Sequence, residues 1–178
     1  GNIVGSPGNT ARAITVAAHT SRTSWTAQAG TFAFTVRSTL GDLATFSSSG
    51  PSRPVRDALA RQKPDIAAPG IAIFSSLSAN TNPVPSTALV NLDGVHIISL
   101  GTSMSAPMVT GSVALLLERN RGLTPEQVRA ILAGSARSDG FTAVAYNTAS
   151  GSPVGAPLPN ASWGYGKLDV QAALAATP

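Results

Sequence analysis

The sequence predicts an α/β fold with a mainly parallel sheet. Short apolar runs at residues 13–18, 71–77 and 94–101 are rich in β-branched side chains, as expected for strands. Residues 103–120 and 125–134 have helical patterning instead. Strands that alternate with helices along a chain are typical of layered α/β domains, whose strands run mostly parallel.

Composition and charge limit the classes of function. The chain has 178 residues, enough for one domain, and its 11% charged residues with 17 glycines and 13 prolines indicate a turn-rich fold. Its net charge of +4 comes from 12 basic and 8 acidic residues. The densest basic run lacks interleaved aromatic residues, so we expect a solvated surface loop and no nucleic-acid partner; its cations are Arg53, Arg56, Arg61 and Lys63.

The sequence also argues against cysteine chemistry and against a membrane span. With no cysteine, neither a disulfide framework nor thiol chemistry can be proposed. No apolar run approaches the roughly 20 residues that span a bilayer, so no membrane span is expected. The chain starts at Gly1 and reaches a strand-like segment within 20 residues, and we therefore expect a piece of a longer polypeptide.

Several segments should be extended. Alternating Phe32, Phe34 and Val36 indicate a half-exposed strand, and prolines at both ends of the segment 63–70 hold it extended. Polar, proline-bearing stretches at residues 78–87 and 151–162 should be loops. The expected extended segments are 13–18, 31–38, 63–70, 71–77 and 94–101.

Three helices are expected. The helix at 103–120 is apolar nearly all round, which predicts a position in the middle of a domain. A capping box of Thr124 and Gln127, with Pro125 at the first helical position, starts the second helix. A short third helix lies in KLDVQAALAA, residues 167–176.

The stretch LGTSMSAPMVTG, residues 100–111, presents Ser103 as a candidate nucleophile at the start of a helix. Unpaired backbone N–H groups at a helix N-terminus can stabilise an oxyanion beside this residue. The alternative is that Thr102 and Ser103 simply cap the helix. A Gly-x-Ser-x-Gly hydrolase motif is excluded because Ser105 stands where that motif has glycine.

The stretch GTSMSAPMVTG resembles the serine motif of the subtilisin-like serine peptidases (subtilases), Gly-Thr-Ser-Met-Ala-x-Pro followed by a Val-x-Gly helix. Other stretches resemble further segments of this family in the family's order: GSPGNTARAITVAA, TFSSSGPSR, KPDIAAPG and WGYGKLDVQAAL. The resemblance covers nearly the whole chain, but only the C-terminal part of the family's catalytic domain.

The resemblance implies a three-layer subtilisin-like fold, with residues 1–178 as the C-terminal portion that carries the central serine helix. It implies a serine endopeptidase acting on polypeptides, in which Ser103 is the nucleophile of a Ser-His-Asp triad. The triad's Asp and His belong to an N-terminal half that would precede Gly1, so that half is the expected partner. No cofactor is evident, calcium is possible by resemblance, and the parent protein would be secreted or at the cell surface.

The chain's own residues do not supply obvious substitutes for the missing triad members. His96 precedes Ser103 by seven residues, roughly 23 Å in an extended strand, and His19 follows the first strand. The order Asp42, His96, Ser103 mimics the triad, but the family's motifs surround neither Asp42 nor His96. We expect both histidines to be structural or surface residues.

Other polar residues have expected local roles. Asp65 of KPDIAAPG should hydrogen-bond to its turn, and Asn2 is a candidate for the family's oxyanion asparagine. Met108 replaces a histidine found in many members and should face the helix interior.

Three hypotheses follow. The chain is an inactive fragment of a working peptidase, a non-catalytic binding or structural domain derived from one, or an unrelated α/β protein in which Ser103 caps a helix. Exposed strand edges and a bare apolar face are expected for a lone fragment.

Overall fold

A parallel pair of strands forms the centre of the fold. The computed structural model describes residues 4–33, 39–52, 60–83, 85–146 and 153–178. Strand β1 (Val16–Thr20) pairs in parallel with β4 (Ile66–Ile71), with Val16 opposite Ile66. Isolated bridges extend this pair on both sides, from His19 to Leu43 and from Ala67 to Lys167.

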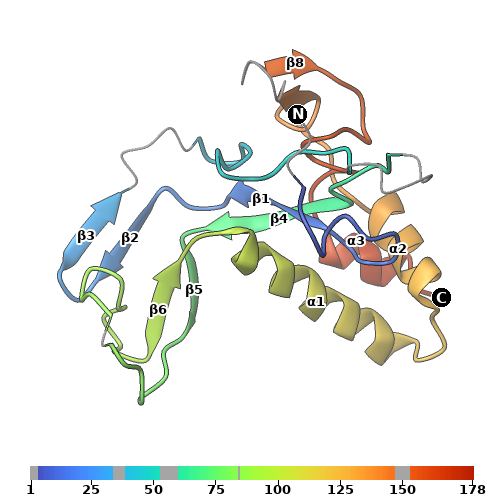
Figure 1. Cartoon of the computed structure of the whole chain (residues 1–178). Helices are drawn as coiled ribbons and strands as arrows, with labels where there is room; N and C mark the ends of the chain where they lie inside the picture. Colours follow the sequence, from blue (N-terminus) through green and yellow to red (C-terminus); the bar gives the residue numbers. More distant parts are fainter. Residues whose placement is uncertain (1–3, 34–38, 53–59, 84, 147–152) are drawn as a thin grey trace.

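Different segments cover the two faces of the parallel pair. Successive strand residues point to opposite faces, so neighbouring residues of one strand belong to different cores. Three helices lie on one side of the pair (Figure 1): α1 (Thr102–Arg119), α2 (Pro125–Gly134) and α3 (Val170–Ala175). Ile66 and Ala68 pack there in a core with Val109, Leu116, Leu123, Val128, Leu132 and Ala173. Ala17 and Ala67 pack instead with Leu43 and the fully buried Trp163.

Antiparallel hairpins complete the described structure. Strands β2 (Ser24–Ala27) and β3 (Gly30–Ala33) pair with each other, as do β5 (Ile73–Ser76) and β6 (His96–Ser99). These two hairpins lie together at one end of the molecule, and the third, β7 (Val144–Tyr146) with β8 (Pro153–Gly155), lies apart from them (Figure 1). The α/β class is confirmed, although parallel pairing among the described strands is confined to β1 and β4.

Most expected elements are present, but three short strands are not among the expected ones. The segment 31–38 is a strand as far as Ala33, and its remainder lies outside the described residues. The segment 151–162, expected as a loop, contains β8, and neither β2 nor β7 is expected from the sequence. All three are hairpin strands of three or four residues, too short to show a clear alternation.

Helix α1 does not lie wholly inside the protein, contrary to the expectation from its composition. Its buried side chains are Ser105, Val109, Ser112 and Leu116, which lie on one face. On other faces Met108, Leu115 and Leu117 are 37–43% exposed. The prediction that Met108 faces the interior is therefore wrong for this chain, because no described residue covers that side of the helix.

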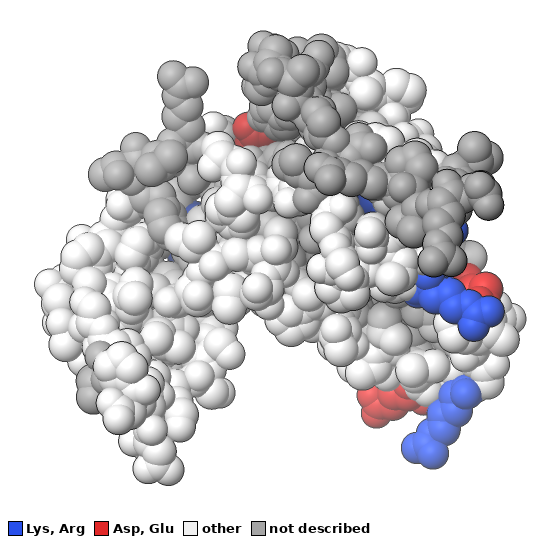
Figure 2. Space-filling model, in the orientation of Figure 1, with Lys and Arg blue, Asp and Glu red and all other residues white. Residues whose placement is uncertain are grey.

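Charge is distributed unevenly along the sequence and over the surface. Between Asp65 and Glu118 the sequence holds a single charged residue, Asp93, and this stretch includes β5, β6 and most of α1. In Figure 2 the visible charged side chains gather mostly at the end that carries α2, whereas the hairpin end is almost uncoloured.

Candidate active site

Ser103 lies in the first turn of α1, at the point where the chain leaves strand β6. The N-cap is Gly101, with φ 145° and ψ 162°, a conformation that side-chain-bearing residues rarely adopt, and no side chain caps the helix. Thr102 is therefore the first helical residue and Ser103 the second. The interpretation of Thr102 or Ser103 as a simple N-cap is wrong.

The backbone around Ser103 leaves hydrogen-bonding groups unused. Its N–H is one of the first helical donors, which have no partner within the helix, and no described residue accepts from it. Its side chain is exposed, and no described residue hydrogen-bonds its hydroxyl. Pro107 lacks the N–H that would bond to the Ser103 carbonyl, four residues before it. The result is a free hydroxyl beside a free donor at the positive end of a helix.

Strand β4 fixes the start of this helix through two glycines. The Gly101 N–H donates to the Gly70 carbonyl at 2.8 Å. A Cβ on Gly70 would overlap the Ser105 hydroxyl and lie 2.6 Å from Ala18 Cβ and 3.0 Å from the Gly101 carbonyl oxygen. Gly70 thus supports the site, a role that was not predicted, although this glycine ends the KPDIAAPG segment.

Ser105 lies on the opposite side of the helix from solvent. It is 0% exposed, and its Oγ has no hydrogen-bond partner among the described residues. Its position against Gly70 shows that the helix and strand approach very closely here. The serine motif quoted above has alanine at this place, so the hydroxyl is what distinguishes this chain from the motif here.

His96 lies in a histidine–carboxylate pair, but not with Ser103 or Asp42. Its Nδ1 is 2.7 Å from Asp93 Oδ2 in an exposed contact. His96 is the first residue of β6, so this contact lies at the opposite end of the strand from Gly101 and Ser103. Asp42 instead accepts a hydrogen bond from the Leu43 N–H, next to β1. No hydrogen bond joins His96 to Ser103, so the triad-like order of these residues does not form a triad.

His19 is a buried residue of β1. It is 8% exposed, and its Nδ1 has no partner among the described residues. Burial, followed by the positive charge of Lys167, lowers the pKa of His19 to about 4. Lys167 is itself buried and binds the Gly41 carbonyl and Asp139 at 2.5 Å each. His19 does not hydrogen-bond to Ser103 either.

Asp65 and Lys63, singled out from the sequence, form an ion pair away from Ser103. Asp65 accepts from Lys63 at 2.6 Å within its own segment, but its other partners are distant in the sequence: the Thr15 N–H at 2.7 Å and Arg129 at 2.8 Å. The expected hydrogen bonding to its own turn is therefore only a small part of its role. Lys63 is only 1% exposed, contrary to its expected place in a solvated loop, because Asp65 and the Ala13 carbonyl bind its ammonium group. Asn2, Arg53 and Arg56 lie outside the described residues.

Acidic and imidazole side chains do not cluster in the part of the chain that the structure describes. These residues contain no group of three or more His, Cys, Asp or Glu side chains that could hold a metal ion. Within the same residues, no helix is both long enough and apolar enough to cross a membrane.

Comparisons with known proteins agree on one family. The model of the subtilase family (peptidase S8) matches residues 1–166. Serine protease AprX of Bacillus subtilis (strain 168) is 36% identical over 90 residues, which are 51% of this chain and 19% of AprX. Subtilisin-like protease SBT3.6 of Arabidopsis thaliana is 40% identical over 100 residues, which are 56% of this chain and 11% of that protein.

Solved structures show the same fold. Fervidolysin from Fervidobacterium pennivorans, described as a keratinolytic enzyme related to subtilisin, aligns with 97% of this chain and 20% of its own at a TM-score of 0.59 and 23% identity. A protease from Pseudoalteromonas arctica aligns with 97% of this chain and 38% of its own, at a TM-score of 0.59 and 24% identity. Compared with AprX and SBT3.6, this chain spans about a fifth or less of each protein's length. With a family match over most of its length and a serine at the start of α1 where the family's motif has it, the chain belongs to the subtilase family of serine peptidases.

Proposed function

We propose that this chain supplies the nucleophile Ser103 to a serine endopeptidase whose triad is completed by a histidine and an aspartate from outside the chain. The observation that carries the proposal is the state of Ser103, an exposed hydroxyl in the first turn of α1 with a free backbone N–H. Neither histidine of the chain hydrogen-bonds to it, so the base has to come from elsewhere.

The proposed reaction follows from this geometry. Ser103 Oγ attacks the scissile carbonyl carbon while the incoming histidine takes its proton and then passes it to the leaving amine. The oxyanion accepts a hydrogen bond from the Ser103 N–H, where the helix N-terminus adds partial positive charge. Water then hydrolyses the acyl-enzyme. The hydrogen bond between Gly70 and Gly101 holds the helix start, so the hydroxyl and this donor keep a fixed relation.

The missing partner is the N-terminal half of the catalytic domain, and two surface features support it. A shallow groove of about 180 Å³ between β1 and α1 is lined almost entirely by apolar side chains, among them Ile14, Val16, Ala106 and Val109. Farther along α1, Leu115 and Leu117 are exposed. Exposed apolar surfaces on globular proteins mark contacts with other proteins, with membranes or with ligands. Because this surface lies beside the helix that carries Ser103, we assign it to the N-terminal half of the domain.

Labelling with a serine-directed fluorophosphonate tests the proposal. The isolated chain should label poorly, because no base activates Ser103, and the chain joined to its N-terminal half should label strongly. Ser103→Ala should abolish labelling of the joined protein, whereas Ser138→Ala, at an exposed serine after α2, should leave it unchanged.

Two outcomes would contradict the proposal. Strong labelling of the isolated chain at Ser103 would show that the base lies within these residues. No labelling of the joined protein would support the alternative, a non-catalytic binding or structural domain derived from a peptidase. For the parent enzyme we further propose export to the cell exterior or surface, which fractionation of the producing cells would test.

A further inference from the structure

A second site lies away from Ser103, between the start of β4 and helix α2. A pocket of about 260 Å³ opens there to solvent, and Ser103 is not among its lining residues. This volume is slightly below the roughly 300–1,000 Å³ of pockets for drug-sized ligands, so it suits a smaller molecule. Its wall is largely aliphatic and includes Ile14, Ile66 and Leu132.

Asp65 and Arg129 are the charged residues that line the pocket, and the buried Lys63 beside them adds a second positive charge. Asp65 lies between two cations, with Lys63 Nζ at 2.6 Å from one carboxylate oxygen and Arg129 Nη2 at 2.8 Å from the other. No other carboxylate of the described residues is within ion-pair distance of Lys63 or Arg129. Two positive charges therefore face one negative charge.

The surplus charge is accessible at Arg129. Lys63 is 1% exposed and Asp65 15%, whereas the Arg129 side chain is 31% exposed and lines the pocket. A guanidinium has five N–H donors. Arg129 uses two groups in hydrogen bonds to described residues, Nη1 to the Ala11 carbonyl and Nη2 to Asp65. Donors therefore remain for an anion.

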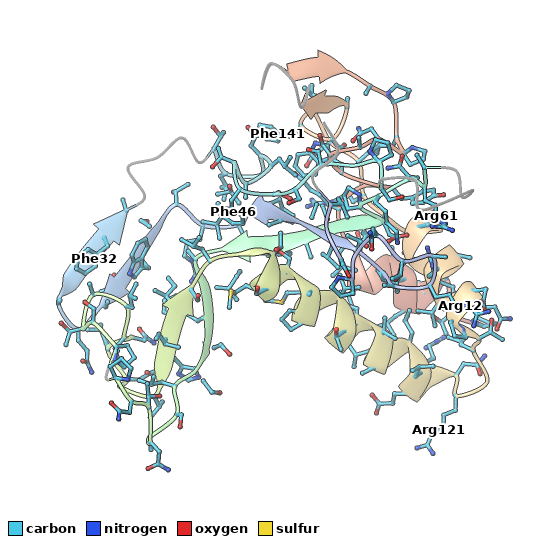
Figure 3. The ribbon with its side chains drawn as sticks, viewed as in Figure 1. Arg12, Phe32, Phe46, Arg61, Arg121 and Phe141 are labelled. Atoms are coloured by element: carbon cyan, nitrogen blue, oxygen red, sulfur yellow. The ribbon has the colours of Figure 1, made fainter. Side chains whose placement is uncertain are left out.

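A tyrosine hydroxyl adds a hydrogen-bond donor to the pocket, and further arginines lie at the same end of the molecule. Tyr165 also lines the pocket, is 43% exposed, and its hydroxyl has no hydrogen-bond partner among the described residues. Arg12 and Arg61 lie on the same side of the molecule as α2, whereas Arg121 points away from it (Figure 3). These arginines add positive charge to this end of the molecule, where Glu126 in the first turn of α2 adds one negative charge.

We propose that this pocket binds a small aliphatic carboxylate of amino-acid size, such as the C-terminal residue of a peptide. The carboxylate pairs with Arg129 and accepts from the Tyr165 hydroxyl, and the aliphatic side chain packs against Ile66 and Leu132. A single accessible guanidinium beside an apolar wall matches one negative charge on an apolar body. The site does not require the proposed peptidase activity.

Ligand-observed NMR titration of the purified protein that carries this chain tests the site. N-acetyl-leucine should bind saturably, and N-acetyl-leucinamide, which has the same side chain but no charge, should bind about tenfold more weakly or worse because a charge-assisted hydrogen bond is lost. Arg129→Gln should remove the preference for the acid. Arg121→Gln, at an exposed arginine outside the pocket, should bind as the wild type does.

Two further variants keep the result interpretable. Because Arg129→Gln also removes an ion pair of Asp65, Ala130→Phe provides a test that leaves all charges in place; it fills the pocket from an exposed position of α2 and should abolish binding of both ligands. Ser103→Ala should bind as the wild type does, which separates this site from the peptidase proposal. Equal binding of acid and amide, binding retained in Ala130→Phe, or no saturable binding of the acid would each overturn the proposal.

Discussion

Replacing Ser105 with alanine should stabilise the protein, although Ser105 lies two residues from the proposed nucleophile. Its hydroxyl is completely buried without a partner among the described residues. A buried, unsatisfied polar group costs about 1–3 kcal/mol. Alanine also has a higher helix propensity than serine, by about a few tenths of a kcal/mol. Removing the oxygen atom also removes its van der Waals attraction to Gly70, so we expect Ser105→Ala to raise the free energy of unfolding by about 1–2 kcal/mol.

Ser112 provides a matched control in the same helix. It is 3% exposed, but its Oγ donates to the Met108 carbonyl at 2.8 Å. Ser112→Ala therefore loses a hydrogen bond worth about 0.5–1.5 kcal/mol while gaining the same helix propensity. We expect this variant to be neutral or destabilised by up to about 1 kcal/mol.

Equilibrium urea unfolding of the complete catalytic domain, followed by tryptophan fluorescence, measures both effects. The midpoint should rise for Ser105→Ala at an unchanged m-value. If both variants lose the same stability, the Ser105 hydroxyl has a partner in solution and this explanation is refuted.

Three other changes have defined outcomes. Gly70→Ala should lower the free energy of unfolding by about 1–3 kcal/mol, because the new methyl group overlaps the Ser105 hydroxyl; a thermal melt that matches the wild type would contradict this. Thr124→Ala should cost about 1 kcal/mol through loss of the capping box, measured as a lower helix signal and a lower Tm. His19 has a folded-state pKa of about 4, so the unfolded chain binds more protons below pH 6.5, and stability should fall by about 3 kcal/mol from pH 6.5 to 4. His19→Gln should flatten this pH dependence in urea titrations, whereas His96→Gln should not.

Local sequence signals predicted the parts of the fold that depend on neighbours along the chain. The capping box of Thr124 and Gln127 is present with both hydrogen bonds, because its partners are only three residues apart. The start of α1 at Ser103 was predicted to within one residue for the same reason. Asp169 caps α3 through the Ala172 N–H, another short-range contact.

Contacts between distant segments could not be predicted in this way. The β2–β3 hairpin is stabilised by stacking of Trp25 on Phe32, with ring centroids 5.8 Å apart, and by the Trp25 indole N–H, which donates to the Ala88 carbonyl 63 residues away. Burial of Lys63 likewise depends on Asp65, the Ala13 carbonyl and the fold that brings them together. The periodicity of α1 showed that it is apolar but not which described segments would cover it.

At the candidate site, the sequence motif predicts Ser103 as the nucleophile but does not predict the residues that support it. Ser103 is recognisable from its motif, whereas the fit of Gly70 against α1 depends on the approach of strand and helix. The pairing of His96 with Asp93 was not predicted either, although the two residues are only three positions apart and a turn between them is enough to bring their side chains together.

The separation of charge along the molecule has a consequence for how ionic strength affects its two sites. Long-range attraction of a ligand requires net local charge, and salt weakens that attraction over a Debye length of about 8–10 Å at physiological strength. The sequence between Asp65 and Glu118, which includes Ser103, carries almost no charge. Peptide capture at Ser103 should therefore be nearly indifferent to added sodium chloride, whereas carboxylates arriving at the arginine-rich end should be progressively released by it.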